Sequence, residues 1–307
     1  MHAKSAFTSV TLSVIALFAP GCAAEDDVDA RALLTGGNSG GGTVFNTNVL
    51  DEREFSEVAP LDTPHMGWAL DQWTLADATE VAEVLVDAGE LVAVDADGAR
   101  HRGAALVGSV WRVGYAMGLR QVPVRLGEVL EHDGVPHYRF FEHTDDGAVS
   151  TCPSGPDGPG RARVLADLRV DESTGAVHAA PRFLHLACDT GATGKVAALG
   201  YHDVALANDD LALFEVGIRA LRADYCYDGA SHTEPGVAFL LADVWGLRAA
   251  SDEEAKRPVE AVWGRDGLLC AGEGRKTDIA CEEPAPPCEH PVNFASYPDA
   301  LYITRLP

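Results

Sequence analysis

The chain is poor in positive charge. Lys and Arg account for 23 of its 307 residues and Asp and Glu for 47, so the formal net charge is -24. Proteins that bind nucleic acid or that attach electrostatically to anionic lipid concentrate basic side chains, and this composition argues against both classes. A net charge far from zero keeps a globular protein soluble and by itself requires no partner. The sequence therefore predicts no nucleic-acid partner.

Long apolar runs are also scarce. Residues 10–18 are mostly apolar, but they are too few to span a bilayer as a helix. With Lys4 in front of them, they have the pattern of an export signal. The small residues 19–21 then precede Cys22, an arrangement that resembles a bacterial lipoprotein signal, in which this cysteine is lipidated and becomes the mature N-terminus. The alternative is ordinary cleavage near residues 23–24. We expect residues 1–22 to be this signal, and the protein to be exported, either anchored to the outer or cytoplasmic membrane through Cys22 or secreted.

The remaining cysteines are few and even in number. An even count in an exported chain predicts disulfides, and six cysteines allow 15 pairings, among which the sequence alone does not choose. The six are Cys152, Cys188, Cys226, Cys270, Cys281 and Cys288.

The composition changes along the chain in a way that suggests its organisation. Residues 23–48 are polar and rich in glycine, so we expect a flexible linker there. Residues 49–180 are β-rich, and repeated Asp-Gly turns favour an antiparallel meander, barrel or sandwich. Pro123 suggests that its own strand lies at a sheet edge. Residues 181–307 form the C-terminal region, either as a second domain or as one domain with residues 49–180.

One principal helix is expected near residues 209–226. Leu211, Phe214, Ile218 and Leu221 fall at helical spacing and predict one buried stripe. Residues 301–305, near the end of the chain, are expected to form an edge strand. The sequence thus predicts an α+β fold, mainly antiparallel β, that is stabilised by disulfides.

Many catalytic motifs are missing. The sequence has no HExxH, no Gly-x-Ser-x-Gly elbow between a strand and a helix, and no complete phosphate loop, and its single Asp-Thr-Gly, at residues 189–191, lacks the second copy that an aspartic protease needs. We therefore predict no metal site and no cofactor.

Cys226, His232 and Asp243 form a candidate catalytic set. They could serve a hydrolase or transferase, but Cys226 lies at the C-terminal end of the expected helix, the wrong pole for lowering a thiol pKa. A free thiol is also unexpected among paired cysteines. The Ser-His-Thr tripeptide at residues 231–233 has no structural explanation from sequence and is the first place to look for a site. A separate hypothesis is a carbohydrate- or surface-binding β domain that presents Trp68, Trp73 and Trp111.

Three ordered blocks resemble a known family. The blocks are residues 222–226 (RADYC) with 228–229 and 231–233; residues 187–188, 191–192, 194–195 and 200–201; and residues 259–263 followed by Cys270. Together, over residues 183–288, they are similar to the ADYC domain family of bacterial exported proteins, often lipoproteins. The resemblance implies an exported or secreted envelope protein, and it transfers no catalytic residue because the family has none established. The leading hypothesis is a non-enzymatic protein with a binding or structural role.

The departures from the family also carry information. Many relatives have cysteines at the positions of Val196 and Gly217, and both are missing here together, as expected if they form one bridge. The resemblance then implies Cys188 and Cys226 as partners, a bridge that would close a loop of nearly 40 residues and contribute about 3–4 kcal/mol in the chain-entropy model.

Overall fold

The computed structural model describes residues 43–45, 57–59, 68–115, 120–132, 134–144, 147–154, 159–171, 174–234, 236–275, 279–289 and 291–307. The expected export signal, Cys22 and most of the expected linker lie outside these residues. The described chain is mostly antiparallel β-structure with three α-helices, of which one is longer than the others. The predicted fold class is confirmed.

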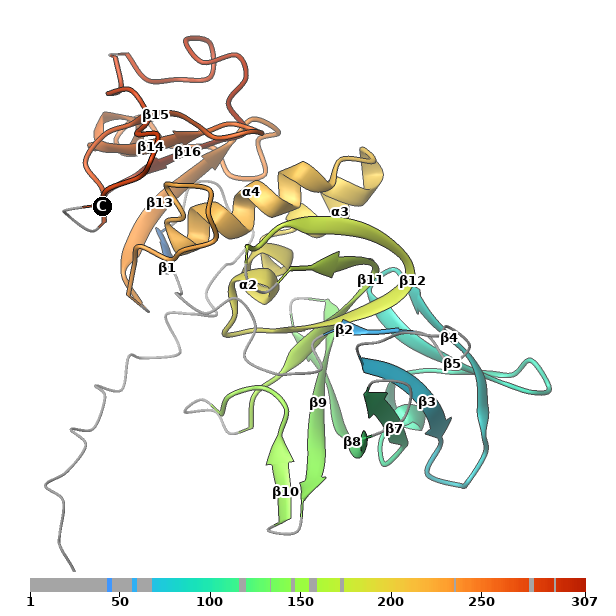
Figure 1. Ribbon diagram of the computed structural model, residues 1–307. Coiled ribbons are helices and arrows are strands. Elements are labelled where there is room, and N and C mark those ends of the chain that lie inside the picture. The colour runs from blue at the N-terminus through green and yellow to red at the C-terminus, as the bar shows by residue number, and fades with distance from the viewer. Residues whose placement is uncertain are drawn as a thin grey trace, which may run out of the picture.

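The larger sheet curls into a half-barrel (Figure 1). Its strands lie in the order β2 (Glu57–Val58), β12 (Val177–Cys188), β11 (Ala162–Val170), β9 (Val135–Thr144), β8 (Arg120–His132), β7 (Val110–Tyr115) and β3 (Trp68–Thr74), with β10 (Gly147–Ser150) paired to β9. The two edges approach each other, because Ala59 N donates to Trp68 O at 3.0 Å and Ala59 O accepts from Leu70 N at 2.9 Å. Of the predicted β architectures, the sheet therefore comes nearest to a barrel.

Aromatic side chains fill the half-barrel. Trp73, Trp111 and Phe140 are buried, and Trp111 lies 5.2 Å from Trp73 and 4.9 Å from Phe140 between ring centroids. A small sheet of β4 (Val81–Asp87), β5 (Glu90–Asp95) and β6 (Arg100–His101), followed by the 3-10 turn η1 (Gly103–Leu106), adds apolar residues to this core. The Tyr138 hydroxyl accepts a 2.7 Å hydrogen bond from Leu91 N and so joins β9 to β5.

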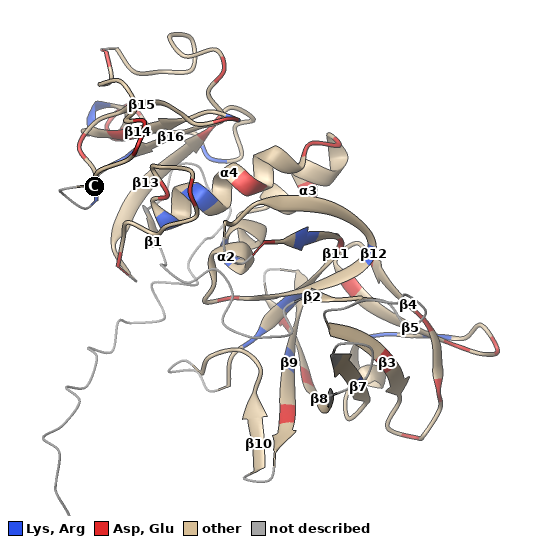
Figure 2. Cartoon of the chain, viewed as in Figure 1, with Lys and Arg blue, Asp and Glu red and all other residues tan. Residues whose placement is uncertain are grey.

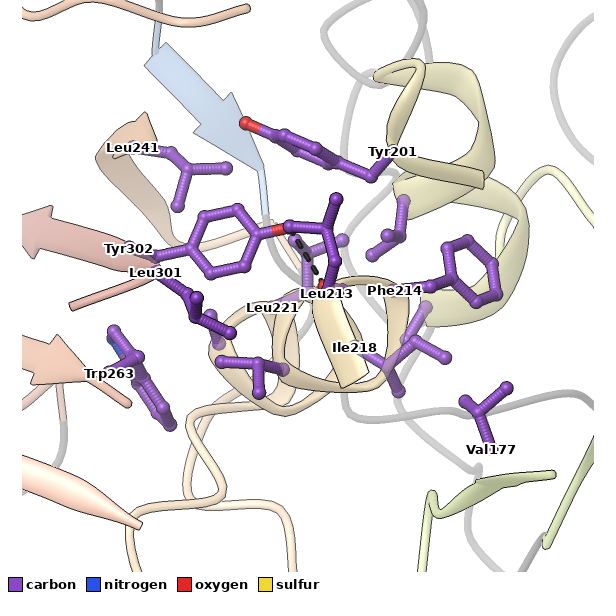
Figure 3. Close-up of a cluster of buried hydrophobic side chains, with 14 of the residues drawn as sticks. Val177, Tyr201, Leu213, Phe214, Ile218, Leu221, Leu241, Trp263, Leu301 and Tyr302 are labelled. Atoms are coloured by element: carbon purple, nitrogen blue, oxygen red, sulfur yellow. Dashed lines mark hydrogen bonds between the residues drawn. The ribbon is translucent and has the colours of Figure 1, made fainter. Parts of the chain in front are cut away.

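The helices α2 (Ala192–Ala198), α3 (Tyr201–Ala207) and α4 (Leu211–Arg222) lie between the two large sheets (Figure 1). The predicted stripe on α4 is buried except for Leu211, which is partly buried, and residues on the other faces of the helix are buried as well. Figure 3 shows why: Trp263 and Tyr302 approach α4 from the C-terminal sheet, and Val177 of β12 lies on another side. The Tyr302 hydroxyl also donates to Leu213 O at 2.9 Å. The helix is therefore a central element of the second core.

The second large sheet contains β1 (Thr43–Phe45), β13 (Ala238–Asp243), β16 (Tyr302–Arg305), β14 (Val259–Trp263) and β15 (Leu268–Ala271), in that order. The short 3-10 turn η2 (Glu254–Lys256) precedes β14. The edge position expected for residues 301–305 is wrong, because β16 pairs with β13 on one side and β14 on the other. Its four residues are all buried, as suits an interior strand.

Two further expectations need correction. Residues 43–45 fall within the expected linker but form β1, because the sequence Thr-Val-Phe favours a strand and Val44 becomes buried at the sheet edge. Pro123 does not mark an edge, because β8 lies between β7 and β9. Because β8 forms long pairings with both neighbours, the sheet tolerates the loss of the one backbone N–H that proline lacks.

The disulfide pairing implied by the resemblance is also wrong. Cys188 is bonded to Cys152 and not to Cys226, and the other bridges are Cys226–Cys281 and Cys270–Cys288. Cys188 ends β12 on the half-barrel side, where its side chain joins the first core. Cys226 follows α4 and is bonded to Cys281, in the part of the chain after Arg275 that is here called the C-terminal tail. The absence of cysteine at residues 196 and 217 therefore does not identify how the remaining cysteines pair.

Candidate functional site

The residues that follow α4 form a compact turn, here called the signature turn (residues 223–229). Ala223 adopts a left-handed conformation, with φ of 53°, and is fully buried. A left-handed residue is a common way to end a helix. Asp224 N then donates to Arg219 O at 2.9 Å, which satisfies one of the last helical carbonyls. The reversal directs the following residues back toward the protein interior.

Asp224 holds the signature turn closed. Its carboxylate accepts hydrogen bonds from Arg219 Nη1 (2.6 Å), Gly229 N (3.1 Å) and Asp228 N (3.2 Å), and its side chain is 0% exposed. Burial raises the pKa of Asp224, although Arg219 opposes this shift. Arg219 is also bonded to Glu215 at 2.8 Å, so its charge is shared between two carboxylates.

Tyr225 enters a second buried network. Its hydroxyl donates to Glu260 Oε1 at 2.5 Å and accepts from Arg275 N at 3.0 Å. Arg275 Nε donates to the same Glu260 oxygen, and its Nη atoms donate to Leu221 O and Ala220 O at the end of α4. Burial, reinforced by the charge of Glu260, raises the pKa of Tyr225. The network thus attaches the end of α4 to β14 and to the chain beyond β15.

Two residues of the Ser-His-Thr tripeptide, Ser231 and His232, cap the end of α4. The Ser231 hydroxyl donates to Arg222 O at 2.9 Å, and His232 N donates to the same carbonyl at 3.1 Å. The His232 ring stacks on Tyr225 with 6.1 Å between ring centroids. These contacts give Ser231 and His232 the structural explanation that the sequence did not provide.

The structure does not assemble the candidate catalytic set. The disulfide with Cys281 leaves Cys226 without a thiol that could act as a nucleophile. Asp243 is 3% exposed and accepts hydrogen bonds from the Tyr201 hydroxyl and from backbone N–H groups of the turn that follows it. Within the described part of the chain, no hydrogen bond joins Cys226, His232 and Asp243 to one another.

The three tryptophans of the carbohydrate-binding hypothesis are inside the protein. Trp68 is 7% exposed, and Trp73 and Trp111 are 0% exposed. A sugar stacks on the exposed face of an indole, so these side chains cannot present such a surface. The prediction that these three tryptophans form a binding surface is therefore wrong, because the large rings of strand residues fill the half-barrel.

A buried His-Asp pair has no signal in the sequence, because its members are 52 residues apart. His137 Nδ1 lies 2.9 Å from Asp189 Oδ2, and Arg161 Nε lies 3.1 Å from the same oxygen. A general base of this type needs a nucleophile next to its second nitrogen. Among the described residues, His137 Nε2 has no hydrogen-bond partner. The pair therefore lacks an attached nucleophile.

One pocket lies beside the Cys270–Cys288 bridge and has a volume of about 410 Å³. Its lining consists of Leu269, Cys270, Pro286, Pro287, Glu289, Pro291, Ser296 and Tyr297. No group of three or more His, Cys, Asp or Glu in the described ranges is placed to hold a metal ion. Acidic residues are spread over both large sheets rather than gathered at one place (Figure 2).

Comparison with known proteins gives one match. Neither the curated proteins nor the solved structures include a match to this chain. The ADYC domain matches residues 103–277, more than half of the chain, and this range includes β7 to β12 as well as the helices and the signature turn. On this match, the chain belongs to the ADYC domain family.

Proposed function

We propose that the protein is a non-enzymatic component of the bacterial cell envelope, with a binding or structural role, that is anchored by a lipid on Cys22. One observation carries this proposal: the chemically versatile side chains of the family signature are engaged in holding the fold. Asp224 is bonded to Arg219 and to the signature turn, Tyr225 to Glu260, and Cys226 to Cys281.

The disulfides support a location outside the cytosol. Three bridges fit an extracellular or periplasmic protein, because the cytosol keeps thiols reduced. None of the described helices is long and apolar enough to cross a membrane. The lipid anchor is proposed from the small residues that precede Cys22.

Metabolic labelling tests the anchor. The full chain, expressed in a bacterium with a lipoprotein pathway and an alkyne-labelled fatty acid, should incorporate the label and partition into detergent. The matched Cys22→Ala variant should incorporate none. A wild-type chain that is exported without label and begins near residue 24 would contradict anchoring and would indicate a secreted protein.

Thiol titration separates this function from the hydrolase or transferase hypothesis. We expect no reactive thiol among the six cysteines when unreduced mature protein is denatured and treated with an alkylating reagent. If the reagent alkylates Cys226 in the native protein, this result would instead support a cysteine nucleophile and overturn the structural role of that residue.

A further inference from the structure

The turn between β13 and η2 exposes a cluster of apolar side chains, here called the apolar turn (residues 244–247). Val244 is 45% exposed, Trp245 37% and Leu247 41%. The described chain exposes seven large apolar side chains, and three of them lie within these four residues. The other four tryptophans are at most 7% exposed, so Trp245 is the indole available to a partner. Its ring lies 6.3 Å from that of Tyr302.

The backbone N–H groups of the apolar turn are hydrogen-bonded within the protein. All five N–H groups of residues 244–248 donate to acceptors in the protein. The bonds are Val244 N to Leu301 O (3.1 Å), Trp245 N and Leu247 N to Asp243 Oδ1 (2.8 and 3.1 Å), Gly246 N to Asp243 O (3.4 Å), and Arg248 N to Asp243 Oδ2 (2.5 Å). Loss of water from this turn therefore leaves no backbone donor unpaired, which removes a major cost of entering an apolar medium.

The first residue of β1 lies on the same side of its sheet as the apolar turn. β1 pairs with β13 in antiparallel fashion, with Thr43 opposite Leu240, so the start of β1 faces the end of β13. That end is Asp243, which directly precedes the apolar turn. Residues 23–42 separate Cys22 from Thr43. The linker predicted from their sequence would span about 25 Å as a coil and at most about 70 Å when extended.

We propose that the apolar turn inserts into the headgroup region of the bilayer that carries the lipid on Cys22; this inference rests on the proposed function. Tryptophan is suited to that region, because its ring is amphipathic. The attraction is apolar rather than electrostatic, since the net charge is -24 and exposed Asp252 and Glu253 follow the turn. A single apolar turn binds weakly by itself, but a tether converts its insertion into an intramolecular step.

Tryptophan fluorescence provides the test. The lipidated protein is reconstituted into phosphatidylcholine vesicles, with or without bromine on the acyl chains, because bromine quenches an indole at short range. We expect brominated lipid to quench the Trp245 emission. The Val244→Ser/Leu247→Ser variant, which keeps Trp245, should lose at least half of that quenching. Val149→Ser on β10 is the matched control, since Val149 is 41% exposed on the other large sheet. Brominated lipid should quench the emission of this variant as much as that of the wild type.

A second arm separates this inference from the lipid anchor. The mature chain with hexahistidine in place of Cys22 is attached to vesicles that contain a nickel-chelating lipid. Quenching in this arm supports the inference even if the native chain proves not to be lipidated. Attached protein that shows no brominated-lipid quenching overturns it. Without vesicles, acrylamide quenching of Trp245 that falls as protein concentration rises would assign the turn to contact between copies and would also overturn it.

Discussion

Asp224 is the residue on which the signature turn depends most. A carboxylate that is fully removed from water is stable only if hydrogen bonds and an opposite charge replace its hydration. Here the replacement is one guanidinium and two backbone N–H groups. Asp228, four residues later, is exposed, and its carboxylate accepts a hydrogen bond from Ala230 N, so it provides a direct comparison.

Asp224→Asn should lower the free energy of unfolding by about 3 kcal/mol, because it removes one charge from a buried pair and leaves Arg219 partly uncompensated. Asp228→Asn should change it by less than about 0.5 kcal/mol, as for most surface substitutions. Urea titration followed by circular dichroism measures both values. Equal, small effects of the two substitutions would mean that Asp224 is not a structural residue.

A second residue-scale prediction concerns pH. Arg265 donates two hydrogen bonds to Asp210, at 2.5 and 2.6 Å, and this lowers the pKa of Asp210 from 3.8. A carboxyl whose pKa is lowered by folding stabilises the protein above its unfolded pKa, and this contribution is lost as pH falls through the lowered value. Both side chains are partly exposed, so the effect is about 0.5 kcal/mol. The stability difference between wild type and Asp210→Asn should be present at pH 6 and should shrink as the pH falls below 3.8. A difference that is unchanged at pH 3 would exclude the ion pair as its cause.

At the scale of elements, α4 is packed more closely than its sequence pattern indicates. A Cβ at Gly217 would lie 2.9 Å from Val196 Cγ1 of α2 and 3.2 Å from the Tyr302 hydroxyl of β16. Gly217 therefore allows the helix to approach both neighbours. Residues 196 and 217 are therefore adjacent. The 2.9 Å distance is close to the separation between the Cβ of one cysteine and the sulfur of the other in a disulfide.

Val196→Cys combined with Gly217→Cys should therefore form a fourth disulfide in an oxidising host. Intact mass after alkylation of the unreduced, denatured protein should show no added label. Gly217→Ala is the matched control, because it adds the Cβ without a bond, and it should lose about 1–3 kcal/mol of stability through overpacking. Two labelled thiols in the double variant would show that α2 and α4 are not this close.

The elements differ in how far the sequence could predict them. The α4 stripe was predictable, because Phe214, Ile218 and Leu221 repeat at helical spacing and are all buried. The position of β16 was not, because the strand that a four-residue segment joins depends on partners about 40 and 60 residues away. Turn dipeptides located hairpins such as β8–β9, but they carry no information on how strands close into a half-barrel.

At the scale of the whole molecule, a helix layer connects the two large sheets, and two bridges fix the C-terminal tail. Cys226–Cys281 closes a loop of 55 residues and Cys270–Cys288 one of 18. The chain-entropy model gives about 4 kcal/mol for the first and about 3 kcal/mol for the second. Cys281 belongs to the tail that follows Arg275, so the first bridge reinforces the attachment of α4 to this part of the chain.

Replacement of Cys226 and Cys281 by serine should therefore lower stability by about 4 kcal/mol and should allow a protease to cut the tail near residues 279–289. Replacement of Cys270 and Cys288 provides the comparison and should have a smaller effect on stability. Guanidinium titration and limited proteolysis measure the two results. The opposite order of stabilities would show that strain or residual structure, and not loop length, decides the contributions.

The candidate site was less predictable than the fold. The sequence places Cys226 and His232 close together, and both lie at the end of α4. Their neighbouring positions do not reveal that Cys226 forms a disulfide or that the backbone N–H of His232 caps the helix. The partner of Cys226 is 55 residues away, beyond any local pattern. The apolar turn also gave no signal, because Trp245 differs from the buried tryptophans only in its position in the fold.

We conclude that residues 223–226 maintain the structure, with Cys226 bonded to Cys281 in the C-terminal tail. Peptide mapping of the unreduced protein by mass spectrometry tests this conclusion most directly. We predict three cross-linked pairs, Cys152–Cys188, Cys226–Cys281 and Cys270–Cys288. Recovery of Cys226 as a free thiol, or joined to Cys188, would contradict the claim.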